Sequence, residues 1–108
     1  MYIGNDFPPQ NPDETNTHSM NFARDLASGE TISSSVWFCT VHPMSDVADA
    51  SASSRIIGSA QIVGTRSLQK VGDLVAGVLY ILQCTTVTSL GNKPSYWAHI
   101  RGRAVGSG

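Results

Sequence analysis

The chain has 108 residues, of which 41% are hydrophobic and 14% charged, and its formal net charge is -1. This length suits a single domain whose core forms without help from metals or disulfides. With so few charged side chains, the surface is built mostly from small polar residues and glycine, which favours short strands over long amphipathic helices. The composition disfavours nucleic-acid binding, because the basic residues are few and scattered.

The first ten residues lack the basic start and apolar core of a signal peptide. No run approaches the roughly 18 consecutive apolar residues of a membrane span. We therefore expect a protein made in the cytosol with no membrane partner. Cys39 and Cys84 are expected to be free thiols, because they form no CxxC pair and cytosolic thiols stay reduced.

Charge is divided unevenly along the chain. Residues 1–54 hold seven acids and one base, a balance of -6, whereas residues 55–108 hold one acid and six bases, a balance of +5. In a β-sandwich the two halves interleave, so these charges can mix on one surface and largely cancel. Alternatively, an acidic face and a basic face stack copies head to tail or meet a charged partner.

Residues 1–14 contain three prolines and several polar turn formers. Proline disfavours both a helix and an interior strand, so this segment predicts an extended N-terminal arm before a domain over residues 15–108. A frayed terminus is the common fate of such a segment. The apolar residues Tyr2, Ile3 and Phe7 favour the alternative of an arm that docks on a partner.

Side chains alternate from residue 15, with His18, Met20 and Phe22 on one side and polar residues on the other, which predicts a half-buried strand. Residues 24–30 then predict a turn, because the segment contains a glycine suited to positive φ. A second strand is predicted over residues 31–41. It is apolar on both faces near its end, so we expect it to be a central strand.

Residues 42–54 are rich in proline, aspartate, alanine and serine, which predicts a surface loop of residues too polar and small to bury. Residues 55–64 predict a strand with a bulge or bend at Gly58. A short strand is predicted to follow over residues 67–71.

Residues 78–88 form the clearest predicted strand, placed at the centre of a sheet between residues 31–41 and 96–105. Val78, Tyr80, Leu82 and Cys84 are predicted to lie on one face of this strand, and Leu79, Ile81 and Gln83 on the other. The last strand is predicted to turn Tyr96, Ala98 and Ile100 inward. Its outward residues form a predicted interface face of Trp97, His99, Arg101 and Arg103. Six or seven short strands without a helix predict an all-β, immunoglobulin-like sandwich with an extended N-terminal arm.

No group of residues indicates catalysis, a cofactor or a metal. His18, His42 and His99 lie far apart, and no HxxxH, HxH or CxxC spacing gathers metal ligands. The serine runs of residues 33–35 and 51–54 lack a nucleophile-elbow motif, and we expect them to be solvated. The glycines lack the phosphate-loop pattern, and one loop with two aspartates has too few oxygen ligands for calcium. We predict a protein that is not an enzyme.

Trp37 near Cys39, followed by Tyr80 and Cys84, invites comparison with antibody-type domains. The order departs from that pattern, because the tyrosine stands four residues before its cysteine rather than two. Both cysteines fall on apolar strand faces, where burial raises the pKa of a thiol and makes it inert. We interpret this arrangement as shared physics rather than shared ancestry.

Residues 17–37, THSMNFARDLASGETISSSVW, resemble the opening of a family of small proteins encoded among tailed-phage structural genes. In that family a proline-and-acid start leads to a strand, a leucine, a GDTI or GETI turn and a serine-rich strand ending in tryptophan. The second half is similar as well. Its matching residues are Gly77, Tyr80, Thr88, Gly91, Ile100 and Arg101.

The resemblance implies an immunoglobulin-like virion component of the neck, collar or fibre-attachment region, or a capsid decoration, without catalytic residues. Its implied partners are a portal or connector, a tail or fibre protein, or a capsid protein, contacted by several symmetric copies. The protein would be made in the cytoplasm of a host bacterium and reside in the virion. The 42–54 loop and the two cysteines depart from the family pattern, so the position in the particle stays open.

A second hypothesis is a carbohydrate-binding or cell-surface-binding module. Sandwiches of this kind often expose aromatic side chains for sugar stacking, and Trp97 and Tyr2 are the candidates here.

Overall fold

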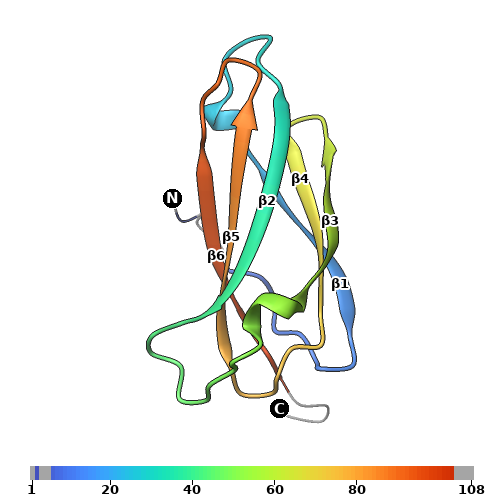
Figure 1. Cartoon of the computed structure of the whole chain (residues 1–108), viewed down its shortest axis with the longest axis vertical. Coiled ribbons are helices and arrows are strands. Elements are labelled where there is room, and N and C mark those ends of the chain that lie inside the picture. Colours follow the sequence, from blue (N-terminus) through green and yellow to red (C-terminus); the bar gives the residue numbers. More distant parts are fainter. Residues whose placement is uncertain (1, 3–5, 104–108) are drawn as a thin grey trace.

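A computed structural model describes Tyr2 and residues 6–103 of the chain, and it consists of two three-stranded antiparallel sheets (Figure 1). One sheet has the order β1-β4-β3 and the other the order β2-β5-β6. The six strands are β1 (Thr15–Asn21), β2 (Ile32–Val41), β3 (Ile56–Val63), β4 (Arg66–Gly72), β5 (Leu79–Thr88) and β6 (Ser95–Arg101). Two short 3-10 helices are η1 (Ala23–Asp25) and η2 (Ala52–Arg55). The predicted all-β sandwich and its number of strands are confirmed.

The core lies between the inner faces of the two sheets. Alternate residues of β5 and β6 point into it, because successive side chains of a strand face opposite sides. Fully buried side chains on these strands include Tyr80, Leu82, Cys84, Ala98 and Ile100. From the other sheet, Met20 and the adjoining Phe22 are buried as predicted, and Phe22 stacks on Tyr96 with ring centroids 4.3 Å apart. Each large apolar side chain buried here stabilises the fold by about 1.5–3 kcal/mol.

β5 is the central strand of its sheet, flanked by β2 and β6, as predicted. The expectation that residues 31–41 form a central strand is wrong, because β2 is hydrogen-bonded to β5 alone and lies at the sheet edge. The apolar residues on its second face, Val36 and Phe38, are 53% and 50% exposed. Apolar residues on both faces of β2 therefore did not mean that both faces are buried. Its second face is an exposed surface.

The irregularity predicted at Gly58 is present in β3. Pairing of β3 with β4 shifts register between Ile57 and Gln61, and Gly58 adopts a φ of +71°. At this register shift, the buried Gln69 side chain donates hydrogen bonds to the carbonyl oxygens of Ile57 (2.9 Å) and Gly58 (3.2 Å). These bonds engage backbone carbonyls at the interruption in the β3–β4 pairing.

The turn over residues 24–30 is held by the buried carboxylate of Glu30. This carboxylate accepts hydrogen bonds from the Ala27 backbone N–H (2.8 Å), the Asn92 side-chain amide (3.1 Å) and the Thr88 hydroxyl. The bond from Thr88 is the main cause that lowers the pKa of Glu30. Glu30 thus ties this turn to the β5–β6 hairpin at the same end of the sandwich (Figure 1).

The described part of the N-terminal segment lies against the free edge of β6. The backbone N–H of Phe7 donates to the His99 carbonyl, and that of Gln10 to the Arg101 carbonyl, both at 3.0 Å. The N–H of Arg103 returns a bond of 2.9 Å to the Gln10 carbonyl. Residues 6–10 therefore act as a short parallel extension of the sheet.

The side chain of Gln10 joins this segment to the other sheet. It is 1% exposed, donates to the Val71 carbonyl at 2.8 Å and lies 2.9 Å from the His18 ring nitrogen. Phe7 packs beside the core, with its ring 4.7 Å from that of His18. The segment thus bridges both sheets, whereas the boundary at residue 14 and docking on a partner stay predictions.

The loop over residues 42–54 is not wholly solvent-exposed, contrary to expectation. Ala52 is 8% exposed, and the Asp49 side chain is 5% exposed. Ala52 is small enough to be buried at this end of the sandwich. The Asp49 carboxylate can be buried because Arg55, at the end of η2, reaches back and donates hydrogen bonds to it. Burial of an acid requires such a partner.

Candidate interaction surface

The outer face of the β2-β5-β6 sheet carries exposed apolar side chains of β2 beside half-buried side chains of β5 and β6. Strand register places Phe38 opposite Gln83 and Gln83 opposite Trp97. The next row along consists of Thr40, Ile81 and His99. We name this face, defined by Val36, Phe38, Ile81, Trp97, His99 and Arg101, the outer face.

The structure places the predicted interface residues of the last strand on this outer face or just beyond it. Trp97 and His99 are half-buried, and Arg101 is exposed. Arg103 follows the end of β6 and is bonded through its backbone to Gln10. Sequence reasoning missed the contribution of β2, although the apolar residues Val36 and Phe38 were the available signal.

Two residues of the N-terminal segment lie over the β6 part of the outer face. The ring of Tyr2 is 4.9 Å from that of Trp97, at an interplanar angle of 47°. Asp6 accepts a hydrogen bond from the His99 backbone N–H at 3.0 Å, and its carboxylate is 3.4 Å from the His99 Nδ1. Although burial opposes ionisation, hydrogen bonds from His99 and Tyr2 lower the pKa of Asp6.

Among the three predicted arm anchors, Tyr2 and Phe7 both contact their own domain. Tyr2 remains 36% exposed, whereas Phe7 is partly buried against the core. Ile3 lies outside the described residues. Phe7 would have to leave the core before it could bind a partner, and Tyr2 is the anchor that a partner can reach directly.

A shallow hollow of about 240 Å³ lies on the outer face. Its lining residues are His42, Ile81, Gln83, Trp97 and His99. The rings of His42 and His99 meet edge to face, with centroids 4.9 Å apart. An indole, two imidazoles and a primary amide offer flat apolar surface together with hydrogen-bonding groups, the combination that a small polar ligand or a partner side chain requires.

A buried ionic cluster lies at the η2 end of the sandwich. Asp49 accepts two hydrogen bonds from the Arg55 guanidinium, at 2.9 and 3.0 Å, and one of 2.7 Å from the Tyr80 hydroxyl. The guanidinium is the main cause that lowers the pKa of Asp49 to about 2. Burial raises the pKa of Tyr80 to about 12, and Asp49 adds to this rise. Both Asp49 oxygens are thus occupied by donors, so this loop has a structural role.

A hydrogen-bonded group in the core joins the two sheets. The Trp37 indole N–H donates to the Ser67 hydroxyl at 2.8 Å, and Ser67 also bonds to the Ser35 hydroxyl. The expectation that residues 33–35 are solvated therefore fails at Ser35, which lies 3.3 Å from the Cys84 sulfur. Here serine satisfies a buried indole that would otherwise lack a partner.

Both cysteines are free and buried. They lie on neighbouring strands but not opposite each other, because Cys39 pairs with Leu82 and Cys84 with Trp37. Burial raises the pKa of Cys39 to about 12 and also raises that of Cys84. The prediction of inert thiols with raised pKa values agrees with this geometry.

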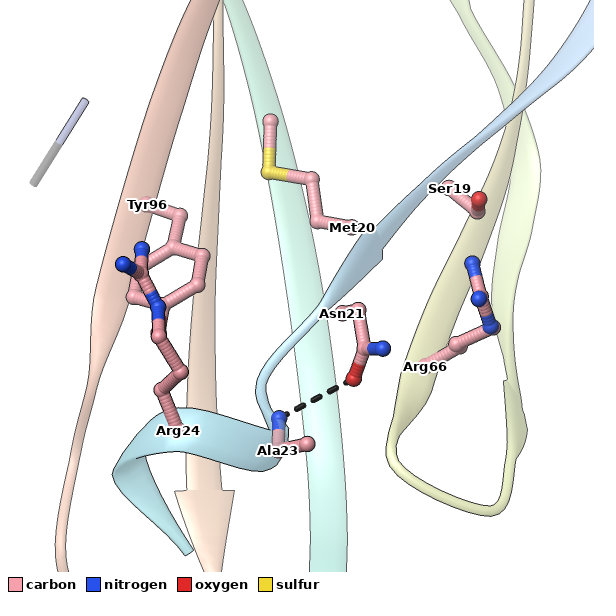
Figure 2. A pocket seen from close by; sticks show the side chains of 7 residues that line it. All are labelled: Ser19, Met20, Asn21, Ala23, Arg24, Arg66 and Tyr96. Carbon is pink, nitrogen blue, oxygen red and sulfur yellow. Dashed lines mark hydrogen bonds between the residues drawn. The ribbon is translucent and has the colours of Figure 1, made fainter. Parts of the chain in front are cut away.

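A second hollow, of about 380 Å³, lies beside η1 (Figure 2). Figure 2 shows Arg24 and Arg66 on opposite sides of β1, with Arg24 on the side of Tyr96. The Tyr96 hydroxyl is buried and has no hydrogen-bond partner among the described residues. The side-chain oxygen of Asn21 accepts a hydrogen bond of 3.0 Å from the Ala23 backbone N–H, which fixes the start of η1. The arginines are exposed and separated by the strand, so they do not converge on one point.

Across the described residues, no three His, Cys, Asp or Glu side chains lie close enough together to hold a metal ion. The same part of the chain contains no helix of the length and apolar character needed to cross a membrane. Comparison with known proteins found no matching family model, no matching curated protein and no matching solved structure.

Proposed function

We propose that this protein is a non-enzymatic assembly module of a phage particle, an immunoglobulin-like sandwich that binds another virion protein through its outer face. The observation that carries the proposal is the aromatic and apolar outer face of the β2-β5-β6 sheet. The phage setting comes from the resemblance of residues 17–37 to tailed-phage structural proteins.

Strand order supports the immunoglobulin-like part of the proposal. The orders β1-β4-β3 and β2-β5-β6 correspond to the B-E-D and C-F-G strands of that fold. The Tyr80 hydroxyl accepts a 2.8 Å hydrogen bond from the Val75 N–H, five residues upstream, as in a tyrosine corner. Trp37 is buried on β2, the strand corresponding to C, and Leu82 occupies the place of the second cysteine.

The composition of the outer face supports protein recognition. Phe38 and Trp97 lie in one row across the sheet, and Arg101 lies near its rim. Aromatic and arginine side chains are enriched in the energetically dominant parts of protein interfaces. An exposed apolar patch on a small domain marks an interaction surface more often than it serves the fold.

Mass spectrometry of purified particles tests this function. The wild-type chain should be found at a constant integer copy ratio to the portal or the major capsid protein. Exchanging Arg101 for glutamate on the outer face should remove it from particles, while Arg66→Glu, which changes the same charge on the other sheet, should not. Absence of the wild-type chain from particles, or normal incorporation of R101E, would contradict the proposal.

Carbohydrate binding is the second candidate, favoured by the hollow that Trp97, His99 and Gln83 line. Tyr2 and Trp97 do not form a flat double platform, because their rings are tilted by 47°, so Trp97 would be the single stacking surface. A glycan array read together with Trp97 fluorescence tests this candidate. Quenching that Trp97→Phe removes would support it, and no response across a broad panel would eliminate it.

A further inference from the structure

The open edges of the two sheets lie next to each other along one side of the sandwich. β2 is the edge of one sheet and β3 the edge of the other, and neither has a strand partner on its free side among the described residues. Residues of both strands, including Val36 and Ala60, line one hollow of about 260 Å³ between them. Figure 1 shows these two strands running along the same flank.

This flank is apolar and uncharged. Every large hydrophobic side chain that the described strands expose lies on it, namely Val36 (53%) and Phe38 (50%) of β2 and Ile62 (39%) and Val63 (60%) of β3. The sequences of β2 and β3, ISSSVWFCTV and IIGSAQIV, contain no charged residue and no proline. Soluble proteins normally protect an open edge with lysine, proline or a covering segment, because an open ladder of N–H and C=O groups invites another strand.

The other two edges differ in this respect. Residues 6–10 bond to the free edge of β6, and Arg101 ends that strand. β1 exposes only polar side chains. Exposed apolar side chains at an open edge are therefore confined to the flank formed by β2 and β3.

We infer that two copies of this chain associate through β2, pairing antiparallel about a two-fold axis at Trp37 to form one continuous six-stranded sheet. Directly opposed residues of antiparallel strands share a face. A register centred on Trp37 sets Val36 of each copy against Phe38 of the other. Centring one position earlier or later would set one of these two apolar side chains against Ser34 or Thr40. An uncharged, self-complementary strand fits a second copy, because no charge on it selects a different partner.

The inference deepens the proposed role of an assembly module in repeated copies and rests on it, but its test needs only the isolated chain. Sedimentation or light scattering over a concentration series should show a species of twice the 11.5 kDa chain mass. Val36→Lys places a charge on the pairing strand and should weaken association at least about tenfold. Leu90→Lys, at an exposed leucine outside the flank, is the matched control. Circular dichroism confirms that both variants are folded.

A mixing experiment tests the register. Chains carrying Val36→Cys and chains carrying Phe38→Cys should form few cross-links alone and a disulfide-linked dimer when mixed and oxidised, since directly opposed Cα atoms of antiparallel strands lie about 4.5–5.5 Å apart, a separation that a disulfide can span. A monomer at all concentrations, a dimer indifferent to V36K, or cross-linking by either variant alone would overturn the inference. A monomeric chain still present in particles would refute only this pairing, whereas a dimer absent from particles would refute the phage role.

Discussion

Replacing Asp49 with asparagine tests the ionic cluster that fixes the η2 end of the sandwich. A pKa lowered from 3.8 to about 2 corresponds to about 2 kcal/mol of folding stability, at ~1.36 kcal/mol per pKa unit. Asparagine has one acceptor oxygen where the carboxylate uses two, so Arg55 would lose at least one of its two bonds. Because the Arg55 side chain is only 16% exposed, we expect a total loss of about 2–4 kcal/mol at pH 7.

The sign of the pH dependence distinguishes this account from a simple packing defect. The folded pKa of Asp49 is lowered, so its contribution is fully present above about pH 4 and is lost as the pH falls towards 2. Urea unfolding of wild type and D49N should therefore give stabilities that converge in acid. Asp46→Asn, at an exposed position in the same loop, is the control and should change little. A difference that stays constant down to pH 2, or an equal loss in D46N, would refute the reasoning.

Three further substitutions test the segments that close the fold. Phe7→Ala should lower the free energy of unfolding by about 2 kcal/mol in urea titrations, because the ring packs against the core, whereas the half-exposed Tyr2→Ala should cost less. Gly102→Ala should destabilise by about 1–3 kcal/mol, since an added Cβ would lie 2.0 Å from the Val75 carbonyl oxygen. Glu30→Gln should lower the melting temperature above about pH 4.5, and the difference should shrink only as the pH falls further through the folded pKa, because the folded pKa of Glu30 is lowered.

Each of these substitutions has an outcome that would count against the structure. Wild-type stability of F7A would mean that the N-terminal segment is not part of the fold, and would favour the alternative of an arm that docks on a partner. A stable G102A would contradict the close approach of residues 75 and 102. A melting temperature of E30Q that falls equally at every pH would show that the carboxylate charge is not what holds the turn.

The strands and most of the core were predictable because period-two alternation is a local signal. The β5 strand could be predicted from its own residues alone, because Tyr80, Leu82 and Cys84 recur on one side of the strand between turn-forming segments. A turn glycine was predictable for the same reason, since positive φ is a property of one residue, as at Gly29.

The failures have a common physical cause, which is that they depend on what lies opposite a residue in space. An apolar second face on β2 is equally consistent with a covered strand and an exposed one, and only sheet order separates the two. Asp49 looked like a solvated loop residue because its partner Arg55 reaches it through the 3-10 turn. The proline-rich start concealed that Gln10 would be buried between the sheets.

The four edges of the two sheets differ in whether other residues of the chain cover them. This difference bears on how copies of the chain could assemble. The chain uses its own residues 6–10 to satisfy the edge of β6, which fixes the N-terminal segment inside one molecule. The same chain leaves β2, ten residues long and uncharged, without any cover among the described residues. An open apolar edge is a risk for aggregation, so a persistent one is best explained by regular occupation. A second copy at β2 would leave Trp97 and Arg101 at the far side of the outer face, still available to a different partner.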